Sequence, residues 1–134
     1  MGEPVSVISN VWDWYLAFNT GAAFSMFGSV SFGRILLTVV AFIAVGIIVY
    51  LAKSAVTRRG LLALAAILGG TVGNLIDRVA FGGVTDFVLW RWHDHEWPIF
   101  NVADVALCLG IGVLLVDMFT SATPAATKAR PDPS

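Results

Sequence analysis

Charged residues are scarce in this chain. Of its 134 residues only 8 are Lys or Arg and 9 are Asp or Glu, whereas 57% are hydrophobic. A soluble domain of this size carries about a quarter charged residues, so the deficit, together with long apolar runs, indicates an integral membrane protein. The net charge of −1 at pH 7 offers no basic surface to a nucleic acid, and we expect no nucleic-acid partner.

Cysteine and histidine are also rare. The single cysteine, Cys108, excludes an intrachain disulfide, and in an apolar run such a residue is most often a small buried hydrophobe. With His93 and His95 as the only histidines, no Ser-His-Asp triad is visible. The run His93-Asp94-His95-Glu96 leaves a zinc site as an alternative, but a full ligand set is not evident. We therefore expect neither a metal nor a cofactor.

Three apolar runs are long enough to cross a bilayer. Because about 20 apolar residues span the hydrocarbon core, we predict transmembrane helices over residues 32–52, 61–76 and 99–119. Residues 1–31 contain alternating apolar and polar positions, a pattern that predicts short strands and a small β-rich element at the membrane surface. The expected fold class is an all-α integral membrane helical bundle with this β-rich element, forming a single domain over residues 1–120.

Basic residues set the expected orientation. The loop after the first span carries Lys53, Arg58 and Arg59 without any acid, which predicts that it is cytoplasmic. The loop over residues 77–98 has more acids than bases and should be periplasmic, on the side where all five tryptophans also fall. A disordered tail over residues 121–134 is then cytoplasmic. Three spans with a cytoplasmic C-terminus place the N-terminal residues on the outer side of the membrane, and nothing before residue 32 could carry them across easily. We therefore expect that a first helix is missing from this sequence.

An acid inside the third apolar run is the strongest functional signal. Asp104 should lie about five residues below the start of the span, where an ionisable group costs at least about 2.5 kcal/mol and persists because it lines a protein interior or a wet cavity. Asn101, three residues earlier, projects to the same side. Asp86 lies upstream in an apolar loop and, in an extended segment, shares a face with Val84 and Val88. Desolvation there should raise its pKa.

Two such carboxylates around one water molecule can hydrolyse an amide. Because neighbouring carboxylates do not both ionise readily, one keeps a proton. The ionised member acts as a base on water and the protonated member donates to a carbonyl oxygen, which is aspartic peptidase chemistry. One alternative is a proton or ion conductor, although that function favours acids spread across the membrane depth. A non-enzymatic scaffold that uses a glycine-rich helix face for assembly is the other.

The second span ends with the segment GGTVGNLIDR, which combines small and polar residues. Gly69 and Gly73 have the spacing that permits close helix approach. Asn74, Asp77 and Arg78 fall at i, i+3 and i+4, so they share one helical face near the outer interface. For Asp77 and Arg78, a surface ion pair that anchors the helix end is the alternative to a functional role.

Four motifs together resemble those of the bacterial lipoprotein signal peptidases (signal peptidase II). They are FNTGAAFSMF at residues 18–27, GGTVGNLIDR at 69–78, GGVTDF at 82–87 and FNVAD at 100–104. Each motif alone is weak, but four in this order are highly specific. The resemblance covers about residues 3–119. The family's first transmembrane helix has no counterpart in this sequence, which agrees with the gap in topology.

The resemblance implies a four-span inner-membrane aspartic endopeptidase, of which three spans are present here, with its site toward the periplasmic side. It implies prolipoprotein substrates that carry a diacylglyceryl-cysteine and are cleaved just before that cysteine. Contact with membrane lipids follows, and we expect a monomer. The residues implied are catalytic Asp86 and Asp104, and site-lining Asn19, Asn74, Arg78 and Asn101. We expect Gly21, Gly73 and Asp77 to be structural residues near the site.

Overall fold

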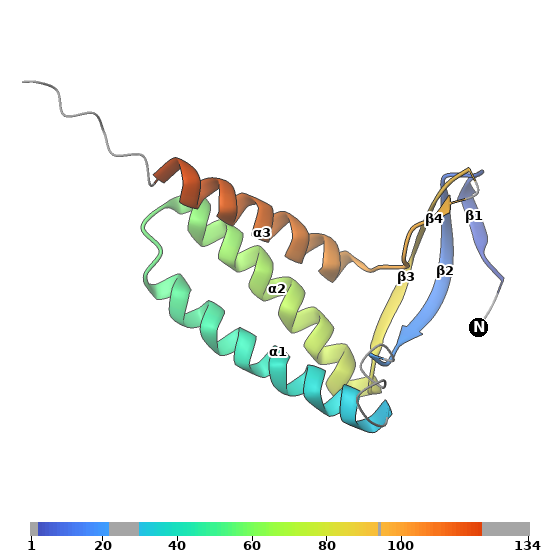
Figure 1. The fold of residues 1–134 in the computed structure, drawn as a ribbon, viewed down its shortest axis with the longest axis horizontal. Helices are drawn as coiled ribbons and strands as arrows, with labels where there is room; N and C mark the ends of the chain where they lie inside the picture. The colour runs from blue at the N-terminus through green and yellow to red at the C-terminus, as the bar shows by residue number, and fades with distance from the viewer. Residues whose placement is uncertain (1–2, 22–29, 94, 122–134) are drawn as a thin grey trace, which may run out of the picture.

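A computed structural model describes residues 3–21, 30–93 and 95–121 of the chain. In this part of the chain, three long helices carry a small antiparallel sheet at one end of the bundle (Figure 1). The elements are β1 (Val5–Ile8), β2 (Trp12–Asn19), α1 (Val30–Lys53), α2 (Arg58–Phe81), β3 (Val84–Trp92), β4 (His95–Glu96) and α3 (Val102–Ser121). The predicted disordered tail, apart from residue 121, and residues 22–27 of the first motif lie outside the described residues.

Within the described ranges, α1, α2 and α3 are each long and apolar enough to cross a membrane, with mean hydropathies of 2.9, 1.6 and 2.2. The predicted ends differ from the observed ones. Helix α2 continues past the predicted end at residue 76 and stops at Gly82, which has a left-handed φ of 79° and donates its N–H to the Arg78 carbonyl. Helix α3 begins three residues later than predicted, because Phe100 pairs with Val88 of β3 instead of joining the helix.

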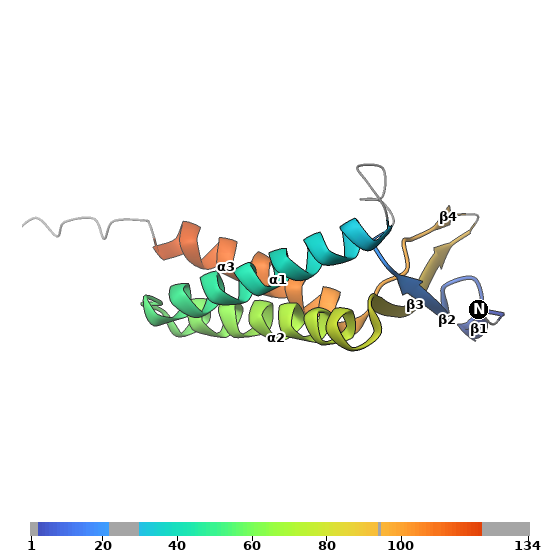
Figure 2. The ribbon, with the colours of Figure 1, turned by 90° about the horizontal axis from the view of Figure 1, so that it is seen from below.

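Helix α2 is the centre of the bundle. It packs against both α1 and α3 (Figure 2), and 39% of its span is buried against 11% for each of the other two. A Cβ added at Gly70 would overlap the Ala103 carbonyl oxygen and come within 2.8 Å of the Leu107 Cγ. A Cβ at Gly73 would lie 3.4 Å from that of Ala103, but one at Gly69 would meet nothing within 4 Å. The close helix approach therefore uses Gly70 and Gly73, not the predicted pair of Gly69 and Gly73.

The sheet combines strands from two segments that lie far apart in the sequence, residues 5–19 and residues 84–96. Its strand order is β1-β2-β3-β4, with all neighbours antiparallel. The β-rich element predicted for the N-terminal segment is present, but β3 and β4 come from residues 77–98, which we predicted to be a loop. Arg91 of β3 links β2 and β4 to its own strand. Its Nε lies 3.0 Å from the Asp13 Oδ2 of β2, and its Nη2 lies 3.2 Å from the Glu96 Oε1 of β4.

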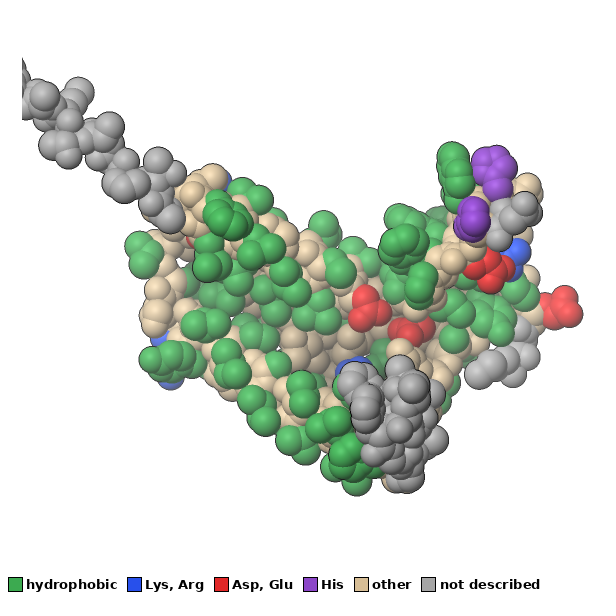
Figure 3. All heavy atoms as spheres, in the orientation of Figure 1, with side chains coloured by type: hydrophobic (Ala, Val, Ile, Leu, Met, Phe, Trp, Pro, Cys, Tyr) green, Lys and Arg blue, Asp and Glu red, His purple; other side chains and the backbone are tan. Residues whose placement is uncertain are grey.

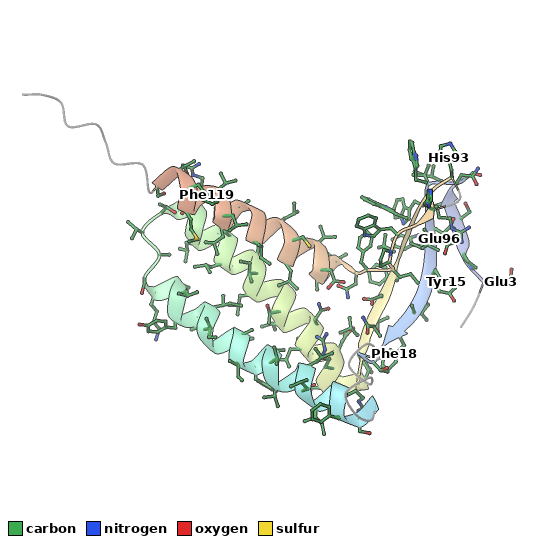
Figure 4. All side chains as sticks on the ribbon, in the orientation of Figure 1. Glu3, Tyr15, Phe18, His93, Glu96 and Phe119 are labelled. Atoms are coloured by element: carbon green, nitrogen blue, oxygen red, sulfur yellow. The ribbon has the colours of Figure 1, made fainter. Side chains whose placement is uncertain are left out.

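The pairing of β2 with β3 places two sequence motifs together. Ala17 lies opposite Asp86, and Asn19 opposite Val84, at the end of the strands nearest the bundle. In Figure 4, Phe18 marks this end, whereas His93 marks the far tip of the sheet. The bundle end of the sheet is therefore where polar residues of the strands can meet polar residues of the helices.

The opposite end of the bundle holds a buried acid, Asp117. An acid near the end of an apolar run is usually a solvated helix terminus, but Asp117 is not. Asp117 is 8% exposed and accepts a 2.6 Å hydrogen bond from the Thr57 hydroxyl. Thr57 also accepts from the Gly60 N–H as the N-cap of α2. The pair thus joins the start of α2 to the end of α3.

Candidate active site

Asp86 occupies the junction between sheet and bundle. Its side chain is 4% exposed, on a strand whose buried face it shares with Val84. One carboxylate oxygen, Oδ1, accepts a 2.8 Å hydrogen bond from the Asn101 amide, and Oδ2 accepts a 3.3 Å bond from the Asn19 amide. Strand β2, strand β3 and the segment before α3 therefore all contribute to holding this one carboxyl group.

Asp104 lies in the first turn of α3, not about five residues inside the span as predicted. Its Oδ2 accepts from the Asn101 backbone N–H at 3.1 Å, and its own N–H donates to the Asn101 Oδ1 at 3.1 Å. This reciprocal arrangement is a capping box, which satisfies N–H groups at a helix N-terminus and favours a negative charge there. Its Oδ1 accepts from the Asn74 amide of α2 at 2.9 Å.

Two asparagines connect the two carboxyl groups. The Asn101 amide donates to Asp86 and, at 3.1 Å, to the Asn74 Oδ1, while the Asn74 amide donates to Asp104. The result is a continuous network from Asp86 through Asn101 and Asn74 to Asp104. Asn74 and Asn101 are 8% and 5% exposed. Because little water reaches their amides, these groups depend on the protein partners for their hydrogen bonds and keep these orientations.

Burial raises the pKa of Asp86 above its ordinary value of 3.8, because desolvation disfavours the charged form. The charge of Asp104 raises it further, whereas the hydrogen bonds from Asn101 and Asn19 and the charge of Arg78 lower it. The raised pKa predicted from the sequence is therefore confirmed in direction.

The remaining predicted site residues hold the framework around this network. Arg78 donates from Nη1 to the Asn74 carbonyl at 3.1 Å. Asp77 does not form the ion pair considered above; its Oδ2 accepts from the Thr85 N–H at 2.9 Å and ties the start of β3 to α2. Gly21, with a φ of 77°, donates its N–H to the Asn19 Oδ1 at 2.9 Å. Gly73 provides the close contact with α3 next to Asn74.

The space-filling view shows acidic side chains gathered where the helices meet the sheet, on a surface that is otherwise largely hydrophobic (Figure 3). Among the described residues there is no group of three or more His, Cys, Asp or Glu side chains that could hold a metal ion. Asp94, one member of the alternative zinc motif, lies outside the described residues. The tip of the sheet, where His93 lies, is remote from the network (Figure 4).

Comparison with known proteins identifies the family of this chain. The sequence model of the family described as signal peptidase (SPase) II matches residues 1–120. The chain belongs to the signal peptidase II family. It is 40% identical over 125 residues to the lipoprotein signal peptidase of Pseudomonas putida, covering 90% of this chain and 73% of that protein. It is 40% identical over 118 residues to that of Symbiobacterium thermophilum, covering 87% and 76%.

Solved structures share the fold. One, described as a bacterial membrane enzyme, superposes with a TM-score of 0.80 at 23% identity, over 97% of this chain and 79% of that one. A second with the same description gives a TM-score of 0.77 at 25% identity, over 88% and 76%. Family membership makes the chain a peptidase and therefore a hydrolase, and its apolar helices agree with a bacterial membrane protein.

Proposed function

We propose that this chain is a membrane-embedded aspartic endopeptidase that removes the signal peptide from prolipoproteins carrying a diacylglyceryl-cysteine, with cleavage just before that cysteine. The observation that supports this most directly is the buried network that links Asp86 to Asp104 through Asn101 and Asn74. Paired carboxyl groups in different environments are the requirement for activating water without a nucleophilic side chain.

The two environments suggest how the roles are divided. Asp86 is buried and has a raised pKa, so it is the member that keeps the proton at rest. Asp104 is partly exposed at the first turn of α3, where it can meet a water molecule, so we assign it the role of base. Asp104 then takes a proton from a water molecule as the oxygen of that water attacks the scissile carbonyl carbon. Asp86 donates its proton to the carbonyl oxygen.

The second half of the reaction returns both protons. The tetrahedral intermediate collapses, its hydroxyl proton returns to Asp86, and Asp104 gives its proton to the departing amine. The C–N bond breaks, and the products are a free carboxyl group and a free amine. The asparagines keep both carboxyl groups oriented through this cycle. Arg78 has N–H groups beyond the one bonded to Asn74 and is the candidate donor to a substrate carbonyl.

The expected setting is the inner membrane, with the sheet and the site on the periplasmic side. All five tryptophans lie in β2, in β3 or just after β4, and indole rings favour a membrane–water interface. Helices α1 and α3 expose most of their apolar side chains, as lipid-facing spans do. We propose that the chain acts as a monomer, without a metal or cofactor.

Single replacements test the pair. Asp86→Asn and Asp104→Asn should each lower the cleavage rate of a purified diacylated prolipoprotein by about 10²–10⁴-fold, the usual contribution of a general acid or base. Asp117→Asn is the matched control, because Asp117 is a buried acid at the other end of the bundle. The proposal fails if either site variant cleaves at the rate of the control.

A further inference from the structure

A groove on the outer half of α1 lies beside the site but is not explained by it. It has a volume of about 330 Å³ and is lined by Ser31, Arg34, Ile35, Thr38, Val39 and Phe42 of α1, together with Arg78 of α2. Its walls are apolar along Ile35, Val39 and Phe42, and its polar end carries two guanidinium groups. Long apolar walls below a cationic end match the shape of a lipid whose headgroup is anionic.

Arg34 is the cation that the site does not use. No carboxylate lies within ion-pair distance of it among the described residues, and no hydrogen bond from its guanidinium is present in that part of the chain. Arg78, in contrast, bonds to Asn74 and lowers the pKa of Asp86 through its charge. Among the described residues, Arg34 therefore has no anionic partner.

The guanidinium of Arg34 lies close to the end of α2. A Cβ added at Gly82, the C-cap of α2, would overlap the Arg34 guanidinium and lie 2.6 Å from its Cζ. A helix C-terminus favours a cation, and the absence of a side chain at Gly82 gives that cation room. Arg34 thus lies against the end of α2 at the mouth of the groove.

We propose that this groove binds one phospholipid, with its phosphate at Arg34 and Arg78 and an acyl chain along Ile35, Val39 and Phe42. The phosphate is the decisive chemistry, because guanidinium groups bind phosphate with strong, charge-assisted hydrogen bonds. A neutral diacylglycerol offers no anionic group to Arg34. The inference does not depend on the proposed cleavage reaction, since a lipid can be retained whether or not the enzyme is active.

Native mass spectrometry of the purified chain in detergent tests this binding. With dioleoylphosphatidylglycerol added, we expect one retained lipid per chain, and Arg34→Gln should weaken retention about tenfold or more. Arg34→Lys should restore part of it, and Arg58→Gln, which removes an exposed arginine at the other end of α2, should match the wild type. Dioleoylglycerol should not compete, and millimolar inorganic phosphate should not displace the phospholipid.

Three results would overturn the proposal. Equal retention of phosphatidylglycerol by the wild type and Arg34→Gln would show that the groove does not recognise the phosphate. Full competition by dioleoylglycerol would show the same. Displacement by inorganic phosphate alone would show an anion site without an acyl-chain groove. Thermal unfolding in detergent without added lipid, measured for each variant, keeps a folding defect distinct from a loss of binding.

Discussion

Asn101 is the residue on which the arrangement of both acids depends, so its replacement by Ala is a stringent test. The change removes the amide that donates to Asp86 and Asn74 and the oxygen that caps the Asp104 N–H. Loss of a helix N-cap costs about 1 kcal/mol, and each lost hydrogen bond in a buried site costs about 0.5–1.5 kcal/mol. We expect the free energy of unfolding to fall by about 2–4 kcal/mol.

Activity should fall further than stability alone explains. Without Asn101, the Asp86 carboxyl loses its 2.8 Å partner, and a displacement of about 1 Å at a reacting group can cost about a hundredfold in rate. The bond from Asn101 lowers the pKa of Asp86, so its loss should raise that pKa. If Asp86 is the proton donor, the alkaline limb of the pH–rate profile moves to higher pH.

The assay is cleavage of a diacylated prolipoprotein across a pH series, together with denaturation of the same samples in mixed micelles. Thr120→Ala is the control, because it removes an exposed hydroxyl from the far end of α3. An Asn101→Ala protein with unchanged stability and an unchanged profile would refute the role of the network. A shift of the acidic limb instead would show that Asp86 is the base.

Three further predictions follow from other contacts. Gly70→Ala should destabilise the bundle by about 1–3 kcal/mol through overpacking against α3. Gly69→Ala, whose new Cβ meets nothing within 4 Å, should be neutral or stabilise the helix by up to about 1 kcal/mol through helix propensity. Denaturation of both variants checks the difference, and equal effects would contradict it. Thr57→Ala and Asp117→Ala should each destabilise by about 1–3 kcal/mol, and a double-mutant cycle should return a coupling of at least about 0.5 kcal/mol. For Asp86, the folded pKa lies above the unfolded value near 3.8, so its contribution to stability is greatest below pH 3.8 and is lost as pH rises through the folded pKa. Asp86→Asn should abolish that part of the fall in unfolding free energy with rising pH. Identical unfolding free energies across the pH series for the wild type and Asp86→Asn would count against a protonated Asp86.

Hydropathy was enough to find the helices but not their ends. The apolar runs predicted three spans because burial in lipid depends mainly on composition. Helix ends are set by specific contacts instead: Gly82 closes α2, and the capping box with Asn101 opens α3. The predicted depth of Asp104 was wrong for this reason, since counting from the first apolar residue included a segment that pairs with β3.

The strand β3 shows a second limit of sequence reasoning. A strand exists because a partner supplies its hydrogen bonds, and the partner of β3 is β2, which lies more than 60 residues earlier in the chain. The motifs identified every residue of the candidate network, but not the order in which they bond. The burial of Asp117 does not follow from the sequence for a similar reason, because the proximity of Thr57 depends on how α2 and α3 pack.

The dispersed origin of the network has a consequence for biosynthesis. Its members span residues 19–104, and Asn101 and Asp104 lie at the N-terminus of α3, the last helix among the described residues. A nascent chain that has emerged only as far as the sheet strands, α1 and α2 contains Asp86 but not Asp104. On the proposed mechanism, cleavage therefore becomes possible only once α3 has entered the bilayer and packed against α2.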